Sequence, residues 1–382
     1  MAAGPFAPDV DVAVVGAGVV GLAVAATLAP RRRLALLERH HSYGLENSSH
    51  NSGVIHAGLY YPPHWLKTRL CVEGNRLLYA WAGAHGLAHR RLGKLVIACS
   101  EEELPALAAL LRQGQENGAP GLEMLTPGEV ARLEPHLRCA GAFFSPSSGI
   151  IDQMGLMRSL LQEAQAHGAL VAFRHQVTGL ERAEGGFRVR YRGPEGEEGE
   201  VGAAVVVNAA GLQADRLGAL LGYDPDGGPD NPPFRQHINR GRYYDLVDRE
   251  KASRLRHLVY PLPQPDRAGA GIHVTIDLEG AVHLGPDSEW LPQGTPLDFR
   301  HDDSARGRFL EAGRAFYPDL RPQDLAPGQV GYRPKLQRPG GPPQDFLIWH
   351  HRGYLHLGGI ESPGLTACLA IARHVAGLLG LG

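Results

Sequence analysis

The N-terminal part of the chain alternates between apolar runs and a glycine-rich turn. Residues 11–15 form a short apolar run that predicts a buried strand, and Leu34–Leu37 predicts a second strand ending at Glu38. Between them lie a tight turn at Gly16–Gly21 and a helical pattern over Val19–Leu28. The order strand, turn, helix, strand predicts a βαβ unit at the start of the chain.

Helical and strand-like patterns keep alternating further along. Residues 153–167 have helical spacing, and a strand-like run at 354–357 is followed by a helical pattern from about 365 to 379. Other strand-like runs cover residues 170–173, 187–191 and 201–208. This alternation is typical of an α/β protein with a largely parallel sheet.

Two long segments between these elements differ in character, because their strand-like runs are broken by loops rich in proline and glycine. These runs are Lys94–Ala98, Arg242–Leu246, Ile272–Ile276 and Val282–Gly285. We therefore expect an α/β fold, α+β overall, in which a β-rich substrate domain is inserted twice into a Rossmann-like nucleotide-binding domain of discontinuous segments. The nucleotide-binding domain is expected to comprise residues 1–88, 146–219 and 336–382, and the substrate domain residues 89–145 and 220–335.

Composition describes an ordinary globular protein. Of the 382 residues, 43% are hydrophobic and 20% are charged, and the formal net charge is -2. Basic residues are almost all arginine and are scattered along the chain, so no nucleic-acid partner is expected. Cys71, Cys99, Cys139 and Cys368 stand far apart without metal-binding spacing. We therefore expect no metal, reduced thiols and a cytoplasmic location.

The charge-free run Val12–Pro30 is nearly long enough to cross a bilayer. The three glycines near its start and its closing proline instead favour a turn and a globular helix. Asp9 and Asp11 precede the run, where a signal peptide would carry basic residues. We expect no transmembrane anchor, and peripheral contact with a membrane stays open.

The turn Gly16–Gly21 has the spacing Gly-x-Gly-x-x-Gly between a strand and a helix. The first glycine permits the turn, the second lets the backbone approach a pyrophosphate, and the third lets helix and strand pack closely. The helix N-terminus adds unpaired amides and a partial positive charge. Glu38 can accept hydrogen bonds from an adenosine ribose and would repel a 2'-phosphate. These residues predict a bound dinucleotide, NAD or FAD, without deciding between the two.

Stretches along nearly the whole chain form a second, more specific pattern. In the N-terminal part they are Val14–Gly21 with Glu38 and Arg39, Asn51–Pro62 and Leu70–Asn75. Further along they are Arg91–Leu95, Val207–Gly211, Tyr260–Pro261, Gly271–Thr275, Leu284–Pro286, Gly331–Lys335 and Gly359–Thr366. Together they resemble the D-amino-acid-oxidase-like flavoproteins, and within them the L-2-hydroxyglutarate dehydrogenase and oxidase branch. The resemblance implies that the dinucleotide is FAD.

The resemblance also implies which segments bind the cofactor. The polar loop Asn47–Gly58 would run along the pyrophosphate and the isoalloxazine edge, where converging backbone amides are needed. In this loop His50 stands where relatives usually carry arginine. The helix near the C-terminus would direct its positive end at the flavin and favour the reduced, anionic form. The predicted cofactor residues are Gly16, Gly18, Val19, Val20, Gly21, Glu38, Arg39, Ser48, Ser49, Asn51, Ser52, Gly53, Val177, Ala210, Gly211, Gly358, Gly359, Ile360, Glu361, Ser362, Pro363, Gly364, Leu365 and Thr366.

Oxidation of an alcohol or amine requires a base that takes the proton from the heteroatom. His56 and His273 are the candidate bases, because neutral imidazole has a suitable pKa, and His56 is slightly favoured since it lies in the cofactor loop. The resemblance implies that Arg333 pairs with the substrate carboxylate through its forked donors. Further candidates for substrate contacts are Lys335, Arg240, Tyr243, Tyr60 and Tyr61.

The sequence thus predicts an FAD-dependent oxidoreductase. We expect it to oxidise a small L-2-hydroxy acid, L-2-hydroxyglutarate or an analogue, to the 2-oxo acid by hydride transfer to flavin N5. Two alternatives stay open: an amine or amino-acid oxidase of the glycine or sarcosine oxidase type, and a flavin-binding subunit without substrate chemistry of its own. The electron acceptor, whether oxygen, a quinone or a partner flavoprotein, is open as well.

Overall fold

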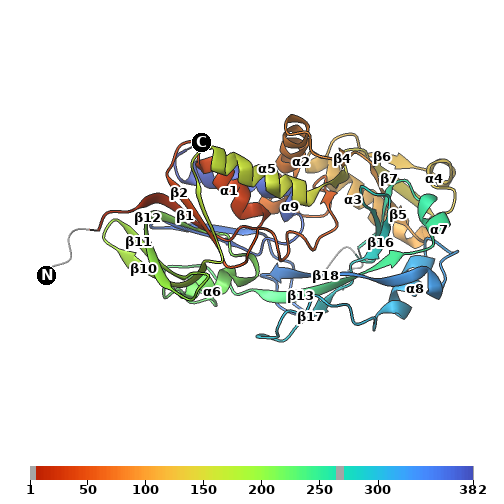
Figure 1. Cartoon of the computed structure of the whole chain (residues 1–382). Helices are drawn as coiled ribbons and strands as arrows, with labels where there is room; N and C mark the ends of the chain where they lie inside the picture. Colours follow the sequence, from red (N-terminus) through yellow and green to blue (C-terminus); the bar gives the residue numbers. More distant parts are fainter. Residues whose placement is uncertain (1–5, 264–270, 382) are drawn as a thin grey trace. The chain divides into compact units, whose positions relative to one another are not determined.

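The computed structural model describes residues 6–263 and 271–381, and the chain divides into two compact units (Figure 1). Unit 1 comprises Met1–Ser49, Gln153–Ile238 and Arg333–Gly382. Unit 2 comprises His50–Asp152 and Asn239–Tyr332. Each unit is therefore assembled from separate stretches of sequence, as the alternation of patterns predicts.

Unit 1 contains a mainly parallel sheet. Its strands are β1 (Val10–Val15), β2 (Leu34–Glu38), β9 (Leu170–Phe173), β10 (Gln176–Ala183), β11 (Gly186–Arg192), β12 (Glu198–Asn208), β19 (Leu347–His351) and β20 (Tyr354–Gly358). Its helices are α1 (Val19–Leu28), α5 (Gln153–Ala166), α6 (Ala214–Ala219) and α9 (Gly364–Leu378), with a 3-10 turn at Gly211–Gln213. Strands β20, β12, β1, β2 and β9 pair in parallel in that order. This arrangement confirms the predicted Rossmann-like domain.

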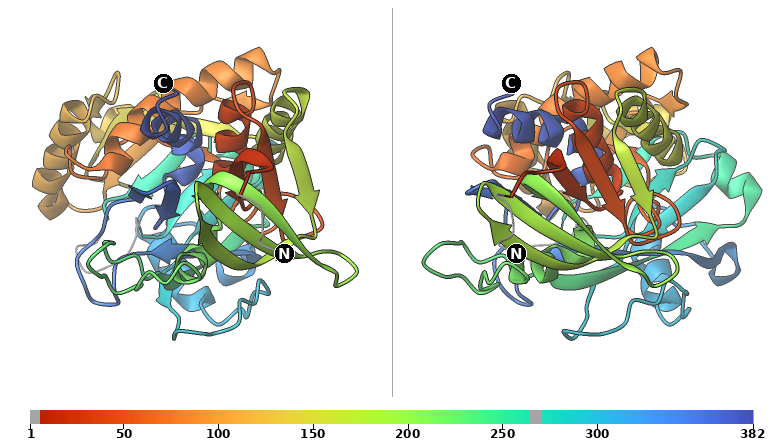
Figure 2. Two further views of the ribbon diagram at one scale, coloured as in Figure 1. Left: turned by 90° about the vertical axis from the view of Figure 1, so that its left-hand side faces the viewer. Right: turned by 60° about the vertical axis from the view of Figure 1, so that its left-hand side comes forward.

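Strand β12 changes its partner along its length. Its first part pairs antiparallel with β11, whereas Val206–Asn208 pairs in parallel with β20. Strands β10 and β11 extend this antiparallel part into a twisted ribbon (Figure 2). The parallel part of β12 ends at Asn208, which leaves the following residues next to the glycine turn after β1.

Helix α1 is apolar on nearly all sides, and eight of its ten residues are buried. It packs beside α5 and α9, and the three helices lie together above the strands of unit 1 in Figure 1. A helix that is hydrophobic all round belongs in a protein core or a membrane. Across residues 6–263 and 271–381, no helix combines the length and the apolar character needed to cross a bilayer. The run Val12–Pro30 is therefore a buried strand, turn and helix.

Unit 2 contains a large mixed sheet and a small one. The strands are β3 (Val54–Ile55), β4 (His89–Arg90), β5 (Lys94–Ala98), β6 (Glu123–Leu125), β7 (Gly141–Ser145), β8 (Gly149–Ile151), β13 (His237–Leu246), β14 (Leu258–Pro261), β15 (His273–Ile276), β16 (Val282–Gly285), β17 (Glu289–Trp290) and β18 (Leu325–Lys335). The first two residues of β13 and the last three of β18 belong to unit 1. The large sheet has the order β17-β13-β16-β15-β14-β5-β7-β6, with β18 beside β13, and the small sheet the order β3-β8-β4. Apolar side chains of the large sheet, among them Leu95, Val259 and Leu284, form one core with Phe309 and Phe316.

The structure adds helices to unit 2 that the sequence analysis overlooked. They are α2 (Leu66–Ala84), α3 (Leu104–Glu116), α4 (Pro127–Leu133), α7 (Arg249–Ser253) and α8 (Arg306–Arg314), with 3-10 turns at Glu101–Glu103 and Pro322–Asp324. One signal for α4 was present, because Thr126 and Glu129 form a capping box at its start. Unit 2 is accordingly less purely β than expected.

The expected boundary after residue 88 also differs from the structure, in which the chain enters unit 2 at His50. Strand β3 pairs with β8, and Asn75 Nδ2 donates to the carbonyl oxygen of Ser147 at 3.0 Å. Residues 50–88 therefore belong to unit 2, because their partners lie near residue 150 rather than in the βαβ unit.

Candidate functional site

The glycine turn after β1 is too tight for side chains. A Cβ at Gly16, which has φ +105°, would lie 2.5 Å from the carbonyl oxygen of Ala209. A Cβ at Gly21 would lie 1.9 Å from the carbonyl oxygen of Gly16, and one at Gly18 would lie 3.0 Å from Ser48 Oγ. The three glycines thus permit close approach to the segment after β12, to the turn itself and to the polar loop. The tight turn at Gly16 is as predicted, and the approach of the Gly18 backbone to a pyrophosphate stays a prediction.

A cavity of about 480 Å³ opens beside this turn within unit 1. Eight predicted cofactor residues line it: Gly16, Gly18, Glu38, Arg39, Ser48, Val177, Ala210 and Gly211. The wall thus combines an open glycine backbone at the start of α1 with a carboxylate at the end of β2. These are the groups that a dinucleotide needs for its pyrophosphate and its ribose, so the residues present fit the predicted cofactor.

Backbone amides fix the carboxylate of Glu38 at the cavity wall. Its Oε2 accepts from the amide of Ala17 at 2.7 Å, and its Oε1 accepts from the amide of His40 at 2.8 Å. Each carboxylate oxygen can accept more than one hydrogen bond, so the group can still receive a ribose hydroxyl. Arg39 is held differently, because its guanidinium is ion-paired with Glu46.

The polar loop begins in unit 1 and ends in unit 2. Ser48 Oγ accepts from the amide of Val19 at 2.9 Å and so binds one of the amides at the N-terminus of α1. After the chain enters unit 2, Asn51 Oδ1 accepts from the amide of Gly53 at 2.9 Å, and Gly53 has φ +63°. The asparagine therefore closes a tight turn on the glycine. The cofactor contacts predicted for Asn51, Ser52 and Gly53 stay predictions.

Among the other predicted cofactor residues, Val19, Val20 and Ser49 do not belong to the lining of this cavity, and neither does Gly358–Thr366. The latter segment joins β20 to α9, and Gly359 has φ +65°. One side chain that the sequence analysis missed ties it to the cavity wall. Gln236 Nε2 donates to the carbonyl oxygen of Gly211 at 2.9 Å, and its Oε1 accepts from the amide of Gly359 at 3.0 Å.

Other residues of the cavity wall were also not predicted. They include Asn47, His175, Gln176, Thr178, Gln213 and Arg216. Most of them follow β9 or β12, at the same sheet edge as the glycine turn. Their position after parallel strands was the available signal, since ligands of α/β sheets bind at the carboxyl ends of the strands.

The predicted substrate residues Lys335 and Arg333 lie at the end of β18. Lys335 Nζ is 2.6 Å from Glu361 Oε2, and both side chains are largely buried. Arg333 is partly exposed. Lys335 is thus paired with a carboxylate of the protein, while a contact between Arg333 and a substrate stays a prediction.

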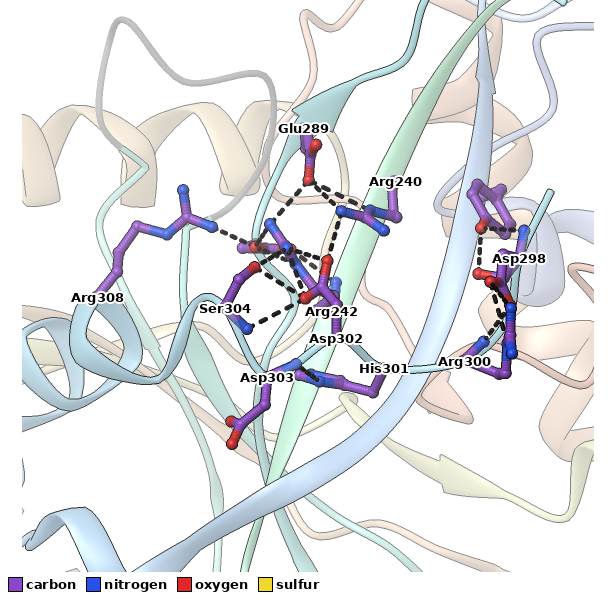
Figure 3. Close-up of polar contacts among 12 residues, drawn as sticks. Arg240, Arg242, Glu289, Asp298, Arg300, His301, Asp302, Asp303, Ser304 and Arg308 are labelled. Carbon is purple, nitrogen blue, oxygen red and sulfur yellow. Dashed lines mark hydrogen bonds and ion pairs between the residues drawn. The ribbon is translucent and has the colours of Figure 1, made fainter. Parts of the chain in front are cut away.

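Arg240 lies in a cluster of arginines and acids in unit 2, drawn in Figure 3. Its guanidinium pairs with Glu289 at 2.7 Å and with Asp302 at 3.0 Å. The neighbouring Arg242 is nearly fully buried and pairs with Asp287 at 2.8 Å and with the same two acids. The carboxylates neutralise both arginines, so Arg240 would bind a substrate carboxylate only in competition with protein acids.

The two candidate bases lie in one cluster in unit 2, in which His273 is buried and His56 is half-buried. His273 Nδ1 lies 2.8 Å from the carbonyl oxygen of Gly271. The imidazole ring of His273 stacks on the ring of Tyr260, with 3.7 Å between the two centroids. Because a carbonyl only accepts, Nδ1 carries hydrogen and Nε2 keeps its lone pair. His56 Nδ1 lies 3.4 Å from Lys94 Nζ. Burial, and then the charges of Lys94 and His273, hold the pKa of His56 well below its usual value, so the imidazole is neutral.

The fold and the cavity define a dinucleotide-binding protein with a Rossmann-like domain. The chain belongs to the family of FAD dependent oxidoreductases, whose model matches residues 11–378. FAD is thus the cofactor, and the chain is an enzyme of this family, as the sequence analysis predicted. The four cysteines are free thiols.

Individual relatives cover nearly the whole chain. It is 38% identical to the mitochondrial L-2-hydroxyglutarate dehydrogenase of Arabidopsis thaliana, over 96% of this chain and 83% of that protein. It is 31% identical to the mitochondrial L-2-hydroxyglutarate dehydrogenase of Homo sapiens, over 96% of this chain and 88% of that protein. Among solved structures, dithionite-reduced L-alpha-glycerophosphate oxidase of Mycoplasma pneumoniae with FAD bound superposes with a TM-score of 0.84 at 26% identity, covering 97% of this chain and 94% of that one.

Proposed function

We propose that this FAD-dependent oxidoreductase oxidises L-2-hydroxyglutarate to 2-oxoglutarate. The main support for this substrate is the similarity, over 96% of the chain, to relatives named L-2-hydroxyglutarate dehydrogenase. The neutral imidazole of His56 supports the reaction type, because it can take the hydroxyl proton of a 2-hydroxy acid. The location of the chain stays a prediction, and the electron acceptor stays open among oxygen, a quinone and a partner flavoprotein.

In this reaction bound FAD accepts the hydride from the substrate carbon. The protein has to hold the substrate carboxylates and remove the hydroxyl proton. His56 is the proposed base, with His273 as the alternative. The hydrogen bond from His273 Nδ1 to the carbonyl oxygen of Gly271 places the hydrogen of a neutral imidazole on Nδ1, so that Nε2 can accept a proton. Arg333 is proposed to bind the carboxylate next to the reacting carbon. Tyr60, Tyr61, Tyr243, Arg240 and Lys335 stay candidates for the remaining contacts.

Anaerobic flavin bleaching tests the substrate. The purified yellow protein is mixed without oxygen with L-2-hydroxyglutarate, D-2-hydroxyglutarate, lactate, glycine or sarcosine, each in a separate cuvette. We expect only the L-2-hydroxyglutarate sample to lose its visible flavin absorbance. Bleaching by glycine or sarcosine instead would make the chain an amine oxidase, and a flavin that none of the five reduces would contradict the proposed reaction. Readmitting oxygen to a bleached sample then shows whether oxygen reoxidises the flavin.

Arg333→Ala tests the carboxylate contact. We expect the KM for L-2-hydroxyglutarate to rise about 10- to 100-fold, since one charge-assisted hydrogen bond contributes about 1.5–3 kcal/mol. The flavin should stay bound, because Arg333 does not line the cavity beside the glycine turn. Arg338→Ala is the matched control, since Arg338 is exposed and lies five residues further along. Equal KM values for the two variants would remove Arg333 from the substrate site.

A further inference from the structure

Lys94 is fully buried at the start of β5 in unit 2, an unusual position for a lysine. Its Nζ lies 3.9 Å from the ring centroid of Tyr260 and 5.5 Å from that of Tyr60. Within residues 6–263 and 271–381, no carboxylate forms an ion pair with it. The polar atom that its Nζ contacts is His56 Nδ1, at 3.4 Å. The buried amine therefore faces the proposed base directly.

This environment makes the Lys94 amine easy to deprotonate. Burial lowers the pKa of Lys94 to about 7, and the nearby Cys71 offsets this only in part. The thiol of Cys71 and the phenols of Tyr60 and Tyr260 do not release protons near neutral pH. Burial raises the pKa of Cys71 to about 12 and raises the pKa values of Tyr60 and Tyr260 as well. Among Lys94, Cys71, Tyr60 and Tyr260, the Lys94 amine is thus the group that exchanges its proton near neutral pH.

The state of Lys94 decides which nitrogen of His56 can act as a base. An ammonium at Lys94 donates to Nδ1, so that the hydrogen of neutral His56 lies on Nε2, which then cannot accept a proton. A neutral amine at Lys94 instead accepts from Nδ1, and Nε2 is then the nitrogen without a hydrogen, which is the one that can take a substrate proton. A contact between an imidazole and a buried amine can therefore switch the base on and off.

We infer that His56 and Lys94 form a proton relay in which Lys94 stores the proton that His56 takes from the substrate hydroxyl. The inference rests on the proposed function, with His56 as the base. As the substrate O–H bond breaks, its proton binds His56 Nε2, and the hydrogen on Nδ1 passes to Lys94 Nζ. The imidazole stays neutral overall and Lys94 becomes an ammonium. FAD, when bound, would supply the acceptor for the hydride from the substrate carbon. The two electrons thus leave with the hydride, and the hydroxyl proton is stored on Lys94.

The first test follows the lysine itself and needs no substrate. The chain has four lysines, at positions 67, 94, 251 and 335, so carbon-13-labelled lysine gives a small set of side-chain signals in the FAD-loaded protein. The signal that disappears in Lys94→Met is that of Lys94. We expect it to titrate near pH 7. A Lys94 signal that keeps its ammonium shift up to pH 9 would overturn the relay.

The second test compares three proteins by the pH dependence of kcat/KM for L-2-hydroxyglutarate. In the unaltered protein kcat/KM should rise with pH and level off above about 7, because Lys94 must lose its proton first. Lys94→Met should lower kcat about 10- to 100-fold and move the rise to pH below 6.5, since His56 is then the base alone. Lys94→Arg should not restore the rate, because a guanidinium keeps its proton. FAD content and Tm are measured for both variants.

Rescue of rate and pH profile by Lys94→Arg would show that Lys94 supplies only positive charge, and would overturn the relay. The two tests also separate this inference from the proposed function. If L-2-hydroxyglutarate does not bleach the unaltered protein, the proposed function fails. If bleaching occurs but no lysine signal titrates near pH 7, the relay alone fails.

Discussion

His56→Gln lowers the rate at which L-2-hydroxyglutarate reduces the bound flavin by about 1000-fold, within the range of roughly 100- to 10000-fold for loss of a general base. Glutamine keeps a similar shape and hydrogen-bonding capacity but cannot accept a proton at neutral pH. The backbone of His56 is held by Asn75, whose Nδ2 donates to its carbonyl oxygen at 2.8 Å, so the loop should keep its conformation. The measurement is anaerobic stopped-flow absorbance of the flavin, with the flavin content of the variant determined beforehand.

His273→Gln is the matched variant, because the same substitution is made in the same cluster. We expect a smaller loss, of about 10-fold, from the altered packing against Tyr260. Reversal of the two effects would identify His273 as the base and would remove the role of Lys94 as well. Loss of flavin from either variant would instead indicate a structural role.

Gly18→Val should give a colourless protein. A Cβ at this position would already lie 3.0 Å from Ser48 Oγ, and the two further methyl groups of valine need more space. They would also cover the amides at the start of α1, where the pyrophosphate is expected. The ratio of flavin to protein absorbance after gel filtration measures the effect, and far-UV circular dichroism shows whether the variant has folded.

Gly377→Val is a suitable control for the glycine substitution. Gly377 lies near the end of α9 in the same unit, is exposed, and has no neighbour within 4 Å of a Cβ placed there. This variant should bind FAD like the unaltered protein. A folded Gly18→Val protein with a full complement of flavin would show that the turn does not bind the dinucleotide.

The sequence by itself determined the nucleotide-binding half of the molecule. The strand, turn and helix over residues 10–28 were predicted almost to the residue, because each follows from a local period of apolar positions and from the glycines between them. The tight turn at Gly16, Gly18 and Gly21 was predictable for the same reason, since spacing along one short segment fixes where their backbones lie.

Only the tertiary structure decided which distant side chains meet. Lys94 and His56 are 38 residues apart, and their contact depends on how β5 and the loop after β3 are placed in unit 2. The side chain of Gln236 likewise hydrogen-bonds to the backbones of Gly211 and Gly359, which are distant in the sequence. Arg240 is neutralised by Glu289 and Asp302, which are more than 40 residues away. The order of the strands and the course of the loops bring these atoms together, and no local period of the sequence encodes either. The chemistry of the cofactor was therefore predictable from the sequence, whereas the lysine that faces the proposed base was not.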